Sequence, residues 1–246
     1  MSRGGESSPA PARVVVALAL VAALGGGCAS TPRPARTSTA TATVPWELPS
    51  NVFGTQRLFQ GSYQGPEGSG SFRATLRLAA ADRFRLDAAD KLGRALWSLG
   101  LEGEGGWFVD HRAGTWCADL TRLELPGLGA APVSAAALPV LLLGALPVRP
   151  AEPLPDPSAP FEVRDAVGRR WSAKVEGGVL TAWTLADAGE PVWWWRRQGR
   201  GGVLSQRQGR QLRWEELVAE PLRGELPVRS IPAGYLESCE PRSASS

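Results

Sequence analysis

The strongest constraint on the fold is an alternation of apolar and polar residues with a period of two, which begins near residue 56. In segments 71–78 and 82–87, every second residue is apolar and most of the residues between them are charged or hydroxylated. Successive side chains of a strand point to opposite faces, so the alternation predicts an antiparallel sheet with one dry face and one wet face. The residues expected on the dry face are Phe72, Ala74, Leu76, Leu78, Phe84 and Leu86.

Further short apolar segments follow, separated by turns that contain glycine. Segments 94–102, 105–110 and 114–120 continue the first group, and a second group runs from residue 161 to residue 232. This spacing is typical of a barrel or a sandwich. We therefore expect a mainly β fold with about eleven strands and no internal repeat.

The alternation stops in residues 128–148, LGAAPVSAAALPVLLLGALPV, which contain no charged residue. A membrane-spanning helix is one interpretation, because about 20 apolar residues are enough to cross a bilayer. Prolines and glycines interrupt the segment, however, and favour a short helix that Ser134 caps and that ends near Gly144. Pro139 would kink this helix or make it start later. A helix that is apolar nearly all round must be buried or must cover an apolar surface.

The N-terminus predicts export. Residues 14–24, VVVALALVAAL, are uninterrupted and apolar but too short for a mature membrane helix, and they predict a signal peptide over residues 1–27. Cys28 follows small residues in a pattern that resembles the lipobox of bacterial lipoproteins, although Gly25 stands where those proteins prefer leucine. The resemblance implies that Cys28 is lipidated. Plain secretion and a retained membrane anchor are the alternatives.

The rest of the chain divides into a tether, a domain and a tail. Residues 28–45 are rich in Ser, Thr, Ala and Pro and predict a flexible tether, and residues 240–246 predict a disordered tail. The folded domain is expected over residues 46–239. Its Cys117 and Cys239 are able to pair in an exported protein, but the sequence leaves the pairing open.

No catalytic or metal-binding motif is present in the sequence. CxxC, GxSxG, HExxH and phosphate-loop patterns are all missing, and His111, the single histidine, is expected to form a solvated polar pair with Asp110 at a turn. The net charge of +3 comes from scattered residues and does not predict a nucleic-acid-binding surface. We therefore expect no enzymatic activity, no metal, no cofactor and no nucleic-acid partner.

The segment VWWWRR, residues 192–197, places Trp193 and Trp195 on one face of a strand and Trp194 on the other. Three interpretations are open. The tryptophans pack in the core with one edge tryptophan beneath arginine side chains, or one face lines a wide apolar cavity, or they form an aromatic belt at a membrane surface.

Taken together, the lipobox-like Cys28, the antiparallel sheet and the apolar helix resemble the LolA/LolB group of lipoprotein carriers and receptors, including LolB-like bacterial lipoproteins of unassigned role. The resemblance covers residues 56–235, and its most specific parts are RFRLDAADKLGRALWSLGLEGEGGWFVD and LPVLLLGALPV. KLG (91–93) corresponds to a PLG-type loop of the family, with Lys91 in place of the usual proline. LLLGALP (141–147) corresponds to the end of the family's helix.

This resemblance implies an incomplete antiparallel β-barrel whose apolar interior binds the acyl chains of client lipoproteins beneath a helical lid. It also implies a loop residue that meets the membrane, which by position is Leu92. The alternative is that Leu92 folds back onto the sheet. The lid residues would be Leu138, Leu141 and Leu142. The expected cavity residues are Phe72, Leu76, Phe84, Leu86, Trp97, Leu99, Trp183 and Trp194.

The resulting hypothesis is a lipid-anchored protein of the bacterial outer membrane that faces the periplasm and binds acyl chains or other amphipathic cargo. A periplasmic carrier protein is an expected partner. Ala29 after Cys28 favours the outer membrane by analogy with the family. One alternative is a structural or interaction lipoprotein with a filled barrel and no ligand. Another is a hydrolase, which would need a cluster of titratable groups in a pocket.

Overall fold

A computed structural model describes residues 46–66, 68–103, 105–118, 124–125, 129–130, 132–150, 156, 159–226 and 231–239. The expected signal peptide (1–27), Cys28, the tether (28–45) and the tail (240–246) lie outside these residues. Contacts divide the chain into two units, and the second, residues 40–246, contains every described residue. Within the described residues, no helix is long and apolar enough to cross a membrane.

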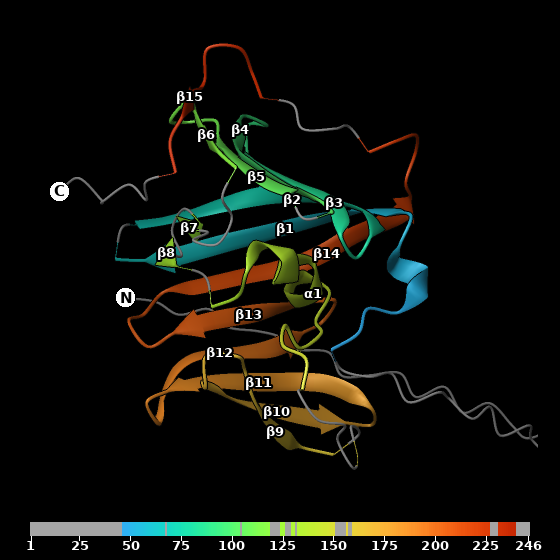
Figure 1. Cartoon of the computed structure of the whole chain (residues 1–246), viewed down its shortest axis with the longest axis vertical. Coiled ribbons are helices and arrows are strands. Elements are labelled where there is room, and N and C mark those ends of the chain that lie inside the picture. Colours follow the sequence, from blue (N-terminus) through green and yellow to red (C-terminus); the bar gives the residue numbers. More distant parts are fainter. Residues whose placement is uncertain are drawn as a thin grey trace, which may run out of the picture. The chain divides into compact units, whose positions relative to one another are not determined.

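The first half of the domain is a meander of antiparallel strands, which we call the first meander (Figure 1). Hairpins connect each strand to the next, as the period-two segments predict. Its strands are β1 (Thr55–Gly65), β2 (Gly68–Ala80), β3 (Arg83–Asp90), β4 (Ala95–Glu102), β5 (Gly105–Asp110) and β6 (Thr115–Cys117).

The second half is another antiparallel meander, the second meander, which contains the tryptophan-rich strand. Its strands are β9 (Phe161–Arg164), β10 (Arg170–Glu176), β11 (Val179–Asp187), β12 (Glu190–Gln198), β13 (Gly201–Gln206) and β14 (Gln211–Pro221). The two meanders join where β1 pairs with β14 and form one open sheet of thirteen strands, with β15 (Leu236–Glu237) at one edge and β9 at the other. The mainly β, unclosed antiparallel fold expected from the sequence is confirmed.

Three short strands complete the strand inventory of the described residues. β7 (Glu124–Leu125) pairs with β8 (Gly129–Ala130), and β15 (Leu236–Glu237) pairs in parallel with β6. The strand expected at the end of the second group, up to residue 232, is wrong in the described part of that segment, where residues 222–226 and 231–232 are irregular. Prolines at 227 and 232 lack the N–H that a strand ladder needs.

The charge-free segment forms two short helical turns, η2 (Ala135–Ala137) and α1 (Leu138–Leu142), which together with the following residues 143–146 we call the lid. A further helical turn, η1 (Ser50–Val52), precedes β1. Ser134 has the extended backbone of an N-cap residue, but its side chain makes no capping hydrogen bond. Pro139 lies in the first turn of α1, where its missing N–H is tolerated, so the α-helical part starts late. Gly144 (φ +75°) ends the helix in the left-handed region that favours glycine.

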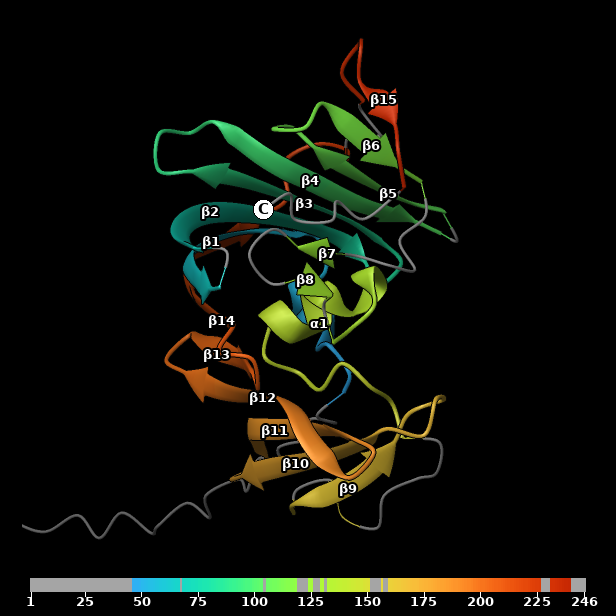
Figure 2. The same cartoon turned by 90° about the vertical axis from the view of Figure 1, so that its left-hand side faces the viewer.

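One face of the sheet, the inner face, carries the apolar core, and the lid packs against it (Figure 2). The buried side chains of both meanders and of the lid form a single cluster. The opposite, outer face is mostly polar in the middle strands, with Gln60, Arg73 and Arg213 exposed. The sheet thus presents one continuous apolar surface to a segment that is itself apolar.

Candidate functional site

The inner face contains most of the residues that the sequence predicts for an apolar site. Five of the eight predicted cavity residues are buried in the core cluster, and Phe72 and Trp97 are partly buried at its margin. These five are Leu76, Phe84, Leu86, Leu99 and Trp183. The structure therefore brings the strands of both meanders to one apolar surface.

Trp194 is the exception, and its placement in the cavity is wrong. Its side chain is 40 % exposed on the outer face, where the register pairs Trp194 with Thr184 and Ser205. Trp193 and Trp195 are the two residues of this strand that are buried in the core cluster. Trp193 pairs with Leu185 and Trp195 with Trp183, which are both buried. The alternation identifies Trp193 and Trp195 as inner-face residues once these partners are known.

The predicted lid residues Leu138, Leu141 and Leu142 are all buried in the core cluster. Leu146, four residues beyond Leu142, is also buried there and was not predicted. Its spacing from Leu142 gave a signal, but the expected end of the helix at Gly144 excluded it. The lid therefore covers the inner face with leucine side chains and no charge.

Two side-chain hydrogen bonds from the sheet hold the lid in place within the described residues. The Trp214 Nε1–H donates to the Leu142 carbonyl oxygen (3.0 Å), and the Arg197 Nη2 donates to the Gly144 carbonyl oxygen (2.7 Å). Arg197 also donates through Nε to the Leu180 carbonyl oxygen (2.8 Å). Burial lowers the pKa of the Arg197 guanidinium from its usual value.

The position of the lid against the sheet requires a glycine where the chain contacts the Arg197 guanidinium. A Cβ atom at Gly144 would lie 2.7 Å from Arg197 Nη2, so any other residue would displace the arginine as well as strain the backbone. Arg197 in turn lies over the Trp195 ring, with its Cζ 5.6 Å from the ring centroid. The lid end, Arg197 and the tryptophan surface therefore form one contact.

A row of tryptophans crosses the second meander on the inner face. Trp171 and Trp183 have ring centroids 5.0 Å apart, and Trp183 and Trp195 are stacked at 6.4 Å. The indole N–H groups of Trp183 and Trp195 are buried without a hydrogen-bond acceptor in the described structure. A buried donor without a partner costs about 1–3 kcal/mol, so these two groups favour a ligand or water that brings an acceptor.

A chain of hydrogen bonds on the first meander involves the single histidine. Ser98 Oγ donates to Asp87 Oδ1 (2.7 Å) and lies 3.0 Å from His111 Nε2, and His111 Nδ1 lies 3.3 Å from the Tyr235 hydroxyl. His111 therefore contacts Ser98 and Tyr235, whereas the side chain of Asp110, its expected partner, accepts hydrogen bonds from the Arg112 and Ala113 N–H groups. Because the serine gives its hydrogen to Asp87, it accepts one from Nε2, and Nδ1 accepts from the tyrosine.

This network ties the C-terminal segment to the sheet. Ser98 is buried, and its hydroxyl hydrogen goes to Asp87 and not to His111. Burial lowers the pKa of His111, an effect that Arg85 strengthens and that Asp87 and Asp110 oppose. We interpret the network as a structural connection between β4 and residues 231–239.

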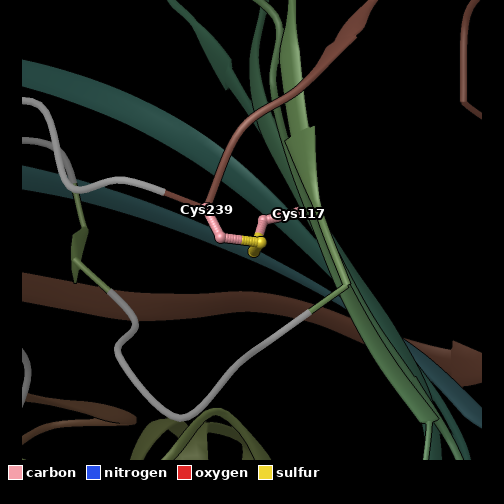
Figure 3. Close-up of a disulfide and its surroundings, with 2 residues drawn as sticks. All are labelled: Cys117 and Cys239. Carbon is pink, nitrogen blue, oxygen red and sulfur yellow. A yellow bond between two sulfur atoms is a disulfide. The ribbon is translucent and has the colours of Figure 1, made fainter.

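Cys117 and Cys239 form a disulfide, which settles the pairing that the sequence left open (Figure 3). Cys117 ends β6 and Cys239 follows β15, which pairs with β6. The two Cα atoms are 4.9 Å apart across a sequence separation of 122 residues. The bond fixes the C-terminal segment against the edge of the first meander.

Leu92 is 79 % exposed at the tip of the β3–β4 hairpin, so the interpretation in which it folds back onto the sheet is wrong. Asp90 accepts hydrogen bonds from the Leu92 and Arg94 backbone N–H groups and pairs with the Arg94 guanidinium (2.7 Å). Burial raises the pKa of Asp90, but these hydrogen bonds outweigh it and hold the pKa below its usual value. Gly93 (φ +79°) completes the turn.

The same turn occurs in the β9–β10 hairpin, where Asp165-Ala-Val-Gly-Arg169 repeats the pattern of Asp90-Lys-Leu-Gly-Arg94. Asp165 accepts from the Val167 and Arg169 N–H groups and pairs with the Arg169 guanidinium (2.8 Å). Val167 is 76 % exposed at the tip. The turn itself therefore holds an aliphatic side chain outward, whatever meets it there.

No protein-family model matches the chain, and no curated protein matches its sequence. Solved structures resemble it over most of its length. A LolA superfamily protein from Nitrosomonas europaea covers 76 % of this chain and 92 % of its own, at 11 % identity and a TM-score of 0.39. An outer membrane lipoprotein-sorting protein domain from Vibrio parahaemolyticus covers 70 % and 86 %, at 7 % identity and a TM-score of 0.40.

An uncharacterized conserved protein from Thermus thermophilus covers 74 % of this chain and 89 % of its own, at 12 % identity and a TM-score of 0.28.

Proposed function

We propose that the chain is a lipid-anchored protein of the bacterial cell envelope that binds acyl chains of lipoproteins, or other amphipathic cargo, on the inner face of its sheet. The observation that carries the proposal is the charge-free lid, which buries its leucines on that face and is fastened by two side-chain hydrogen bonds within the described residues. A five-residue helix has little stability of its own, so its position depends on these contacts. Cargo would take the place of the lid on the apolar face.

The free energy of the contact between the lid and the inner face determines how long an acyl chain must be to displace the lid. Burying one leucine side chain is worth about 1.5–3 kcal/mol, so Leu138, Leu141, Leu142 and Leu146 together contribute about 6–12 kcal/mol. An acyl chain gains about 0.8 kcal/mol for each buried methylene, so roughly 8–15 methylenes match the lid. Long acyl chains meet this requirement and short ones do not.

The unpartnered indole N–H groups of Trp183 and Trp195 favour cargo with a polar atom near its chain. Ester and amide carbonyl groups at the head of an acyl chain are acceptors of this kind. A plain hydrocarbon would leave both donors unsatisfied. The proposed cargo is therefore an acylated molecule rather than an alkane.

The remaining parts of the proposal follow from the N-terminal sequence and the resemblance. Lipidated Cys28 would hold the domain at the outer membrane through the tether, with a periplasmic carrier delivering cargo and Leu92 meeting the membrane. Binding and release of acyl chains need no catalytic group, and we propose that the protein has no enzymatic activity, metal or cofactor.

The test is a chain-length series measured on residues 40–246, the contact unit that contains the whole sheet, the lid and the disulfide. Native mass spectrometry, lipid extraction and tryptophan fluorescence would follow binding of single-chain acyl probes with 8, 12 and 16 carbons and of a diacylated lipopeptide. We expect affinity to rise steeply once the chain exceeds about 8 methylenes. A folded domain that binds none of these probes would refute the proposal and favour a filled barrel with a structural role.

A further inference from the structure

The outer face carries a hollow of about 520 Å³, which we call the cationic hollow. It is lined by Lys91 and by three neighbouring strand segments, residues 71–73 of β2, 60–62 of β1 and 213–215 of β14. The central residue of each segment, Phe72, Gly61 or Trp214, faces the inner side of the sheet by strand alternation. The first and last residues of each segment therefore supply the side chains of the hollow.

Small side chains open the hollow on one side. Ser62 lies between Ser71 and Arg213 across the sheet, and both serines have short side chains. Its volume lies within the range of roughly 300–1,000 Å³ that is usual for small-molecule sites. Room is therefore available for a compact polar group above the backbone of β1.

The charges around the hollow are unbalanced and unpaired. Arg73, Arg213 and Lys91 line it with a single carboxylate, Glu215, and none of these four makes an ion pair or side-chain hydrogen bond in the described structure. Other arginines of this face behave differently, because Arg77 and Arg85 both bind Asp87. Arginine guanidinium groups bind phosphate through paired N–H donors. The arrangement thus has free donors for an anionic phosphate.

Leu92 identifies the source of that phosphate. It follows Lys91 directly, so the most exposed apolar side chain of the described residues stands beside the hollow. A soluble phosphate compound makes no apolar contact with an exposed leucine, whereas a bilayer surface provides both apolar chains and phosphate groups. Asp90 and Gly93 fix the hairpin, so that Leu92 is presented without further ordering.

We propose that the cationic hollow binds the phosphate groups of anionic lipid headgroups while Leu92 enters the apolar layer of the same bilayer. This inference rests on the membrane contact of Leu92 in the proposed function and adds the hollow to it, and it is separate from acyl-chain binding on the inner face. It assigns the outer face of β14, β1 and β2 to the membrane surface.

The experiment measures partition of residues 40–246, without lipid anchor, onto phosphatidylcholine vesicles with and without phosphatidylglycerol. Each cation near an anionic surface is worth about fivefold in binding, so Arg73→Gln with Arg213→Gln should weaken partition onto anionic vesicles about 25-fold and leave neutral vesicles unaffected. Arg83→Gln with Arg196→Gln removes the same charge elsewhere and is expected to change partition much less. Added salt should abolish the difference between the two double variants.

Leu92→Ser is expected to weaken binding to both kinds of vesicle. Val167→Ser is the matched control, because the same turn exposes it to a similar extent in a hairpin that does not line the hollow. Equal losses for the two variants, or equal losses for the two arginine pairs, would overturn the proposal. Binding of soluble glycerol phosphate that is lost in the Arg73→Gln and Arg213→Gln double variant, while partition of that variant onto anionic vesicles is unchanged, would instead assign the hollow to a free phosphate compound and also overturn the proposal.

Acyl-probe binding, measured in parallel, separates this inference from the proposed function. The hollow variants should bind acyl probes as the unaltered domain does, because their side chains lie on the opposite face. Unfolding midpoints confirm that each variant is folded. Failure of vesicle partition with intact acyl binding refutes only the membrane contact, and the reverse result refutes only the cargo site.

Discussion

Arg197→Met tests whether the lid is a displaceable cover or a permanent part of the core. Methionine keeps the apolar stem of the arginine and removes the hydrogen bond to the Gly144 carbonyl oxygen. A hydrogen bond to a charged group contributes about 1.5–3 kcal/mol, and each 1.4 kcal/mol is a factor of ten. The equilibrium constant between the closed and the open lid should therefore shift toward the open form roughly 10- to 100-fold.

Acyl binding and stability should then change in opposite directions. Cargo that needs the open form binds with an affinity reduced by the fraction of open molecules, so weakening the closed form raises affinity by up to the same roughly 10- to 100-fold. The free energy of unfolding should fall, because the folded domain is closed. Trp214→Phe removes the other, neutral hydrogen bond and should raise affinity about two- to tenfold.

The assay is titration with a fluorescent C16 acyl probe, combined with urea unfolding of the same preparations. Arg196→Met is the control, because Arg196 is adjacent in sequence but exposed on the outer face. It should leave both quantities unchanged. If Arg197→Met lowers stability and leaves acyl affinity unchanged or lower, the lid is not an obstacle to binding and the reasoning fails.

Three other predictions follow from the described contacts. His111 has a lowered pKa, so its contribution to stability should be complete above pH 6.5 and lost as the pH falls below that value. The thermal unfolding midpoint should therefore fall between pH 7.5 and pH 5, and His111→Gln should make this fall smaller. Glu216 is buried and binds two arginine side chains, so Glu216→Gln should lower the free energy of unfolding in urea by about 3–5 kcal/mol. Glu215 is the exposed residue next to it in sequence, and Glu215→Gln should change this free energy little. Reduction of Cys117–Cys239 should lower the unfolding free energy by about 2–5 kcal/mol, and equal midpoints with and without reductant would contradict this.

The sheet could be predicted because its strands obey a local rule. In β2 and β3, alternation places Leu76, Phe84 and Leu86 on the buried face, as the structure shows. The pairing of β1 with β14 has no such signal, because its partners lie between 147 and 166 residues apart and compete with every other amphipathic strand. The register of that pair, including its bulge at Leu58/Phe59, depends on tertiary packing.

The candidate site was predictable in its apolar part and not in its polar part. The lid leucines were recognised because an uncharged segment must be covered. Arg197 and the Ser98–His111–Tyr235 connection were missed, because an arginine or a histidine in a sequence carries no sign of which distant carbonyl or hydroxyl it will meet. The cationic hollow was missed for the same reason, since its cations come from three separate segments.

The disulfide has a topological consequence beyond its contribution to stability. The chain leaves β6 at Cys117, passes through the lid and the whole second meander, and returns to Cys239 beside β6, so these parts lie inside a covalently closed ring. A single proteolytic cut between the lid and β9 would open the ring without dividing the molecule. Under denaturing conditions the cut protein would migrate as one covalent molecule until a reductant separated two fragments, each carrying one meander. A protein built in this way tolerates a cut in the connection between its halves as long as its surroundings stay oxidising.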